Sequence, residues 1–123
     1  DLGESLRELE DLKGAMSSFE RALKINVRYA PAHYGLGRLY LKQDNAEKAS
    51  MALRRAVKYE PKEPKYYLKL GEALYEKAKK TNFAGSFLEA KQQLNKALEL
   101  SLDKEELQKD IKAALEKIKS AGF

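Results

Sequence analysis

Several residues on which common functional sites depend are scarce in this chain of 123 residues. The absence of cysteine excludes disulfides and thiolate metal sites, although it leaves the cellular compartment open. The single histidine, His33, has no partners at the spacing that a metal site or a nucleophile–base pair needs. No glycine-rich loop suited to phosphate is present. We therefore expect no catalytic residue, no metal site, no cofactor and no enzyme activity.

Long apolar segments are also missing. No apolar run approaches the ~20 residues that a membrane-spanning helix needs, and no signal peptide is visible. We expect a protein without a membrane span, located in the cytoplasm. With only three prolines and seven glycines, the natural structure is a set of long helices joined by short turns.

The charge content is high but balanced. Charged residues make up 35% of the chain, against about 25% in typical soluble domains, while 43% hydrophobic residues argue against disorder. The net charge is +5, and acids and bases are interleaved along the chain, as on solvated helix faces. This pattern modestly favours an acidic protein partner and makes nucleic acid an unlikely one.

A Leu-Gly pair recurs at a spacing of 34 residues, as Leu2-Gly3, Leu36-Gly37 and Leu70-Gly71. Aromatic rings, His33 and Tyr67, precede the last two glycines by four residues. Small and large apolar residues recur in step with these pairs: Leu6, Tyr40 and Leu74; Ala15, Ala49 and Ala90; Phe19, Leu53 and Leu94; Ala22, Ala56 and Ala97. Alternating small and large residues suit helices that pack closely against one another.

In this register the sequence resembles the tetratricopeptide repeat family, and residues 30–63 match a complete repeat without a gap. The resemblance implies an all-α fold, a right-handed superhelical α-solenoid of antiparallel helical hairpins with a C-terminal capping helix. It divides a single domain, residues 1–123, into a truncated first repeat, a second repeat, a third repeat with an insertion, and the cap. Their ranges are 1–29, 30–63, 64–102 (insertion at about 75–85) and 103–120.

Two helices are expected in the first repeat, one ending near Glu8 and its partner over residues 11–25. We hypothesise that the array is longer, or that another chain completes this repeat. Pro31 opens a helix to about Gln43. The next helix ends near Tyr59 and begins with a capping box made by Asp44 and Glu47.

The third repeat contains seven extra residues before Ala90. We expect its first helix to reach about Lys80, a longer turn over residues 81–85, and a second helix capped by Ser86 with Glu89. A final helix then presents one apolar stripe to the stack, formed by Leu107, Ile111, Ala114, Leu115 and Ile118.

The family resemblance implies that the first helices of the repeats line a concave groove. Its expected surface mixes tyrosine, leucine and basic residues, a composition common at protein interfaces. The alternative is an ordinary helix surface. The residues assigned to partner binding are Arg7, Tyr34, Arg38, Leu41, Lys42, Lys65, Leu68, Lys69, Glu72 and Tyr75.

Two finer interpretations remain open at this point. Lys65 and Lys69 match two elements of the carboxylate clamp that some family members use for acidic chaperone tails, but the other elements are missing. In the insertion, Phe83 and Phe87 either form a second docking point beside nearby lysines or both pack against the lengthened helix.

The sequence thus predicts a protein–protein interaction module, an adaptor or scaffold that binds a partner peptide or helix in the groove. The partner is expected to carry an acidic or amphipathic segment. Three alternatives remain: an RNA-associated basic segment, a non-catalytic arm of a larger enzyme or assembly, and self-association as a homo-oligomer through the N-terminal end.

Overall fold

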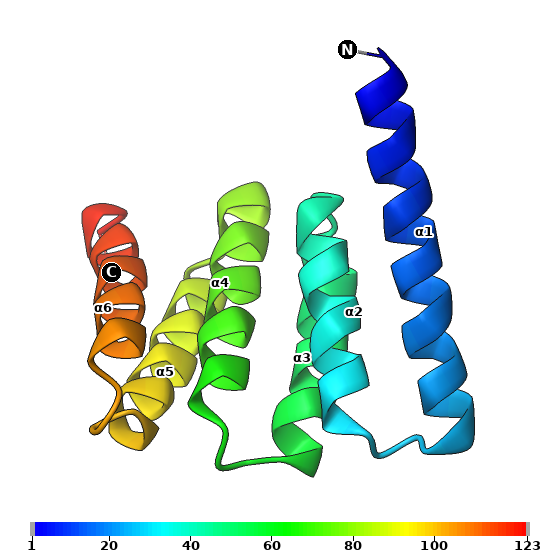
Figure 1. Ribbon diagram of the computed structural model, residues 1–123. Helices are drawn as coiled ribbons and strands as arrows, with labels where there is room; N and C mark the ends of the chain where they lie inside the picture. Colours follow the sequence, from blue (N-terminus) through cyan, green and yellow to red (C-terminus); the bar gives the residue numbers. More distant parts are fainter. Residues whose placement is uncertain (1, 123) are drawn as a thin grey trace.

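The structure, a computed structural model, describes residues 2–122, with side chains from residue 7 onward. This part of the chain forms six α-helices and no strand (Figure 1). The helices are α1 (Leu2–Ile25), α2 (Ala30–Lys42), α3 (Ala46–Tyr59), α4 (Pro64–Thr81), α5 (Ala84–Leu100) and α6 (Glu105–Ser120).

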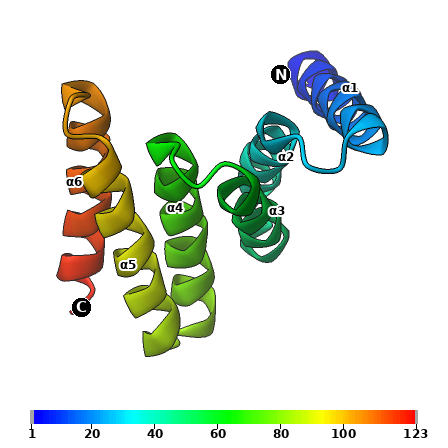
Figure 2. The same ribbon diagram turned by 90° about the horizontal axis from the view of Figure 1, so that it is seen from below.

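Neighbouring helices pair as antiparallel hairpins, α2 with α3 and α4 with α5, and α6 packs against α5 and α4. In Figure 1, α2 and α4 lie in front of α3 and α5, and Figure 2 shows the hairpins following one another in a curved row. The predicted fold class is confirmed. The chain is an all-α, right-handed superhelical solenoid of antiparallel hairpins that α6 closes at the C-terminal end.

Two glycines allow the helices of each hairpin to approach closely. A Cβ atom built on Gly37 would lie 2.5 Å from Cγ of Leu53, and one on Gly71 would lie 2.6 Å from Cγ of Leu94. Both leucines are fully buried. The leucine of the second helix therefore occupies the space that any other residue would fill at the glycine of the first helix.

The turn before each first helix is held by the same hydrogen bond in both complete repeats. Nε2 of His33 lies 2.8 Å from the carbonyl oxygen of Val27, and the hydroxyl of Tyr67 donates to the carbonyl oxygen of Pro61 at 2.8 Å. Each ring thus reaches back six residues. His33 is buried and its ring centroid lies 5.6 Å from that of Tyr59, so this histidine is a packing residue.

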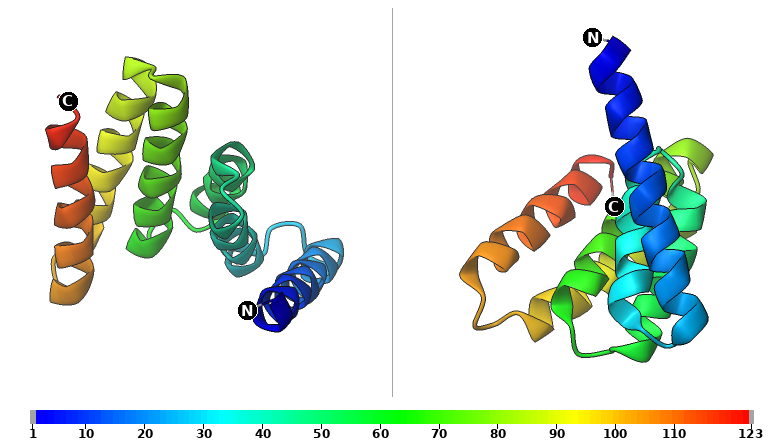
Figure 3. Two further views of the ribbon diagram at one scale, coloured as in Figure 1. Left: turned by 90° about the horizontal axis from the view of Figure 1, so that it is seen from above. Right: turned by 45° about the vertical axis from the view of Figure 1, so that its right-hand side comes forward.

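The first repeat differs from the prediction. Residues 2–25 form one continuous helix, so the expected break between Glu8 and Asp11 is wrong. Leu9 and Glu10 are good helix formers, and no proline or left-handed residue interrupts the helix there. Among the described residues α1 contacts only α2, and Figure 3 shows it projecting past the ends of the other helices.

The capping box assigned to Asp44 is also wrong. Asn45 is the N-cap of α3, and its side-chain oxygen accepts a hydrogen bond from the backbone N–H of Lys48. Asp44 lies one residue earlier with φ of 57°, the left-handed conformation that aspartate tolerates better than most residues. It makes the turn rather than the cap.

The insertion in the third repeat lengthens helices instead of a loop. Helix α4 reaches Thr81, close to the predicted end, but the turn contains only Asn82 and Phe83. Asn82 ends α4 in the left-handed conformation, with φ of 53°, and α5 begins at once. The expected turn over residues 81–85 and the Ser86 capping box are therefore wrong.

The C-terminal helix α6 buries the predicted stripe. Ile111 and Ile118 are almost fully buried, and Leu107, Ala114 and Leu115 pack against the same core. Within residues 2–122, no helix combines the length and the apolar character needed to cross a bilayer. The division of the chain into repeats remains a prediction.

Candidate protein-binding groove

Helices α2, α4 and α6 line one open groove with a volume of about 790 Å³. Its walls carry tyrosine, leucine, basic and acidic side chains. The lining residues are Tyr34, Arg38, Leu41, Lys42, Asp44, Ala46, Lys65, Leu68, Lys69, Gly71, Glu72, Tyr75, Glu76, Leu94, Leu107, Asp110, Ala113, Ala114 and Lys117.

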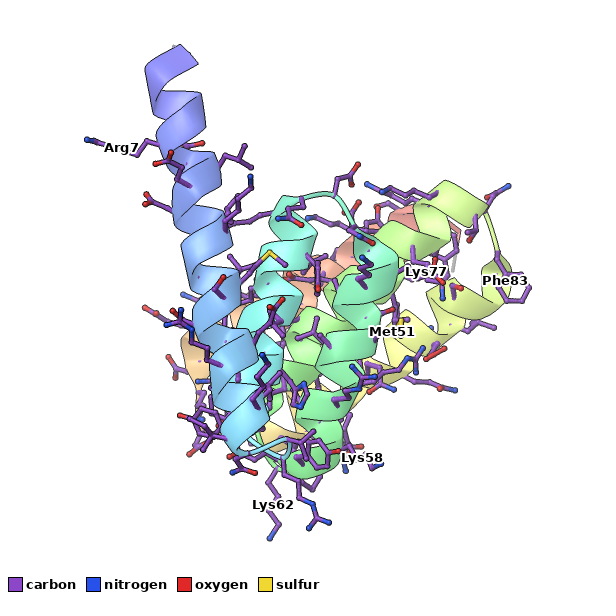
Figure 4. All side chains as sticks on the ribbon, turned by 90° about the vertical axis from the view of Figure 1, so that its right-hand side faces the viewer. Arg7, Met51, Lys58, Lys62, Lys77 and Phe83 are labelled. Carbon is purple, nitrogen blue, oxygen red and sulfur yellow. The ribbon has the colours of Figure 1, made fainter. Side chains whose placement is uncertain are left out.

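Nine of the ten residues assigned to partner binding meet in this groove. The exception is Arg7, which is not among the lining residues and extends away from α1 into solvent (Figure 4). Leu68 is only 5% exposed, so it forms part of the groove floor and of the core. Whether these residues bind a partner remains a prediction.

Tyr34 lies at the centre of an aromatic and basic cluster. Its ring centroid is 4.9 Å from that of Tyr66. The guanidinium of Arg38 and the ammonium of Lys65 each lie 5.6 Å from the Tyr34 ring centroid, which is cation–π distance. Because Arg38 comes from α2 and Lys65 from α4, this cluster joins two successive repeats along the groove.

Tyr66 is the buried member of that cluster. Burial, followed by the nearby carboxylates of Glu60 and Glu63, raises the pKa of Tyr66 to about 12. Its phenol therefore stays protonated and neutral at physiological pH. The positive charge of Arg38 and Lys65 is consequently not offset by a tyrosinate.

Ion pairs offset part of the charge on α4. Nζ of Lys69 lies 3.1 Å from Oε2 of Glu72, and Nζ of Lys79 lies 3.4 Å from Oε2 of Glu76. Other lining cations have no ion pair within residues 7–122: Arg38, Lys42, Lys65 and Lys117. Of the two lysines that matched the carboxylate clamp, only Lys65 is left without a carboxylate partner.

Helix α6, predicted only as a cap, also contributes to the groove. Asp110, Ala113 and Lys117 line the wall opposite α2, at the helical spacing of three and four residues. This spacing was visible in the sequence. The spacing did not indicate a groove wall, because these residues flank the apolar stripe, where a capping helix is expected to face solvent.

The two aromatic rings of the insertion differ. Phe87 is buried and meets the ring of Tyr75 edge-on at 5.9 Å, whereas Phe83 is 64% exposed. The interpretation in which both rings pack is therefore wrong for Phe83. The ring of Phe83 lies over Gly85, where a Cβ atom would approach its Cε1 to 2.7 Å.

In the part of the chain that the structure describes, no group of three histidine, cysteine, aspartate or glutamate residues could hold a metal ion. His33 hydrogen-bonds the backbone carbonyl of Val27 and is not among the residues that line the groove.

A model of the family described as "Tetratricopeptide repeat" matches residues 6–79. The chain belongs to the tetratricopeptide repeat family. Two curated relatives are the anaphase-promoting complex subunit 3 of Schizosaccharomyces pombe, 36% identical over 52 residues, and the protein CTR9 homolog of Arabidopsis thaliana, 33% identical over 73 residues. The matches cover 42% and 59% of this chain but only 8% and 7% of those proteins.

Solved structures of tetratricopeptide repeat proteins share the fold. The Yersinia enterocolitica type III secretion chaperone SycD, in complex with a peptide of the translocator YopD, superposes with a TM-score of 0.78 at 22% identity, over 99% of this chain and 90% of that one. An O-GlcNAc transferase of Thermobaculum terrenum gives a TM-score of 0.70 at 30% identity, over 85% of this chain and 19% of that one.

Proposed function

We propose that this tetratricopeptide repeat chain is a protein-interaction module, an adaptor or scaffold that holds a peptide or helix of a partner in the groove between α2, α4 and α6. The observation that carries the proposal is the cluster of Tyr34, Arg38 and Lys65. It places an aromatic ring and two cations, which form no ion pair within residues 7–122, at one point of an open groove. Aromatic and arginine side chains are enriched at interface hot spots.

The chemistry of the cluster favours a partner segment that is both acidic and apolar. Arg38 and Lys65 attract carboxylates, while Tyr34, Leu41 and Tyr75 offer apolar contact along the same groove. Family membership supports a protein partner, and the chaperone SycD, which shares the fold, is a protein with a bound peptide.

A photo-crosslinking residue in place of Tyr34 would identify the partner, with the same residue in place of Lys109 as the matched control. Lys109 is exposed on α6 and does not line the groove. Binding of the identified partner segment is then measured by calorimetry. We expect Arg38→Glu with Lys65→Glu to weaken binding at least tenfold and to lower its salt dependence, and Lys109→Glu with Lys112→Glu to change it little. Equal effects of the two pairs would refute the groove proposal.

One observation favours a second candidate, a non-catalytic arm of a larger enzyme. The likeness to the O-GlcNAc transferase reaches 30% identity but covers only 19% of that chain. This candidate would be supported if the coding sequence extended into a catalytic domain. Replacing Arg38 and Lys65 should then lower the activity of that enzyme on substrate proteins. An extended sequence without such a domain would eliminate it.

A further inference from the structure

Outside the groove, the opposite side of the stack carries an unbalanced basic surface. Helix α3 contains four basic residues and one acidic residue, Glu47. Its buried face is formed by alanines, Ser50 and Leu53, whereas all its charged side chains are exposed. We call the outermost row, Lys48, Met51, Arg55 and Lys58 on α3 with Lys62 in the next turn, the α3 stripe.

The residues of the α3 stripe follow one another at helical spacing. They are separated by three, four, three and four positions, which keeps the four residues of α3 on one side of the helix, and Lys62 follows in the turn. Figure 4 shows Met51, Lys58 and Lys62 in this order down the face toward the α3–α4 turn. All five are exposed, and Met51 is 50% exposed in the middle of the row. From Lys48 to Lys58 the stripe extends about 15 Å along α3.

Carboxylates leave this stripe largely unneutralised. Arg54, beside the stripe, is ion-paired with Glu89 of α5. By contrast, within residues 7–122 no carboxylate forms an ion pair with Arg55, Lys58 or Lys62. The acids closest in sequence, Glu47 and Glu60, lie near the two ends.

A shallow recess continues the stripe at its lower end. Arg28, from the turn between α1 and α2, lies with Lys58 and Tyr59 around a recess of about 410 Å³. Nζ of Lys58 lies 5.7 Å from the Tyr59 ring centroid. Two cations from different repeats thus converge beside one ring, which suits a carboxylate-bearing side chain.

We propose that the α3 stripe is a second docking surface, for an acidic polypeptide segment that carries an apolar residue among its carboxylates. The row of cations complements a line of acidic side chains, and Met51 at its centre meets the apolar residue. Methionine and arginine are enriched at protein interfaces. A nucleic-acid strand would match the cations but would leave Met51 without an apolar partner, so the polypeptide is the better match.

This proposal does not depend on the groove, because the stripe lies on α3 and the groove is lined by α2, α4 and α6. The two surfaces would let the chain hold two segments at once. Binding at the stripe is therefore tested with variants that leave the groove intact.

The probe is a fluorescein-labelled peptide of glutamates with interspersed leucines, long enough to cover the ~15 Å row, and binding is followed by fluorescence anisotropy at low and physiological salt. We expect Arg55→Glu, Lys58→Glu and Lys62→Glu together to weaken binding at least tenfold. The matched control, Lys109→Glu, Lys112→Glu and Lys119→Glu on α6, makes the same change in net charge and should weaken it less than threefold. Circular dichroism checks that both triple variants keep their helices.

Met51→Ala distinguishes docking from general charge attraction. We expect it to weaken binding of the leucine-containing probe about threefold and to leave an all-glutamate probe unaffected. Equal losses in the two triple variants, or no binding of either probe at low salt, would overturn the proposal. The proposal would also be overturned if Arg38→Glu with Lys65→Glu abolished binding and the stripe variant did not. That result would assign the peptide to the groove. Tighter binding of labelled oligouridylate than of the peptide, sensitive to the same three substitutions, would replace it with a nucleic-acid surface.

Discussion

The ammonium group of Lys80, in the last turn of α4, donates a hydrogen bond of 2.6 Å to the main-chain carbonyl oxygen of Asp44 and lies 3.1 Å from Oδ1 of the same residue. Asp44 belongs to the turn between α2 and α3, one repeat earlier. The lengthening of α4 by the insertion brings Lys80 within reach of that turn. This contact therefore links the second repeat to the third at the end of the molecule opposite the His33 and Tyr67 turns.

Replacing Lys80 with alanine should destabilise the stack slightly. Both partners are largely exposed, and exposed pairs of this kind contribute about 0–1 kcal/mol. We expect the free energy of unfolding in urea to fall by at most about 1 kcal/mol at low salt, with less effect at high salt. Lys112→Ala, on the exposed side of α6, is the control. A larger loss in the control than in Lys80→Ala would contradict this role for the contact.

A methyl group at Gly71 should be far more costly than one at Gly14. At Gly71 the added Cβ would lie 2.6 Å from Cγ of Leu94 and 3.3 Å from the carbonyl oxygen of Ala90, a backbone atom that cannot rotate away. We expect Gly71→Ala to lower the free energy of unfolding by about 1–3 kcal/mol.

Gly14 provides the matched control because it lies on α1 with nothing within 4 Å of the added Cβ. Alanine favours a helix interior over glycine by about 1 kcal/mol, so Gly14→Ala should raise the free energy of unfolding. Urea denaturation measures both. Similar changes at the two positions would mean that helix spacing is not what requires Gly71.

Ionisation of Tyr66 should weaken the fold at alkaline pH. The pKa of Tyr66 is raised from 10.0 to about 12 by burial and by Glu60 and Glu63, so the folded state holds the phenolic proton more tightly than the unfolded state. The resulting stabilisation is fully present below pH 10 and is lost as the pH rises through about 12.

This loss is measured as the free energy of unfolding between pH 9 and 12 in the parent protein and in Tyr66→Phe. We expect a shallower decline in the variant, and no such change in Tyr29→Phe, whose ring is exposed. Parallel declines in all three proteins would assign the alkaline loss to other groups, such as the lysines.

The sequence predicted the hairpins well because their determinants are local. Pro31 marked the start of α2 to within one residue, and Gly37 and Gly71 lie where the helices of each hairpin approach closely. The same repeat register wrongly predicted two helices at the N-terminus. Gly3 falls 34 residues before Gly37, but no breaker follows Glu8, so α1 stays a single helix. A repeat pattern indicates homologous positions, whereas local breakers decide where a helix stops.

The candidate groove was predicted from family offsets, and the basic stripe was not predicted. Acids and bases interleave along the chain, which suggested mixed solvated faces. The charge of this surface depends instead on which cations the acids pair with in three dimensions. Glu89 is paired with Arg54, while Arg55 and Lys58 form no ion pair with a carboxylate among the described residues. Counting charges along a helix cannot reveal which of them are neutralised by the next repeat.

The two turn hydrogen bonds, from His33 to Val27 and from Tyr67 to Pro61, each join the first helix of one hairpin to the turn that follows the preceding helix. A ring only six residues beyond the bonded carbonyl thus helps to hold each hairpin against its predecessor, together with the packing of α3 on α4. The curvature of the whole stack then accumulates from separate local joints. Adding or removing a hairpin elsewhere in the stack would therefore leave these two hydrogen bonds unchanged.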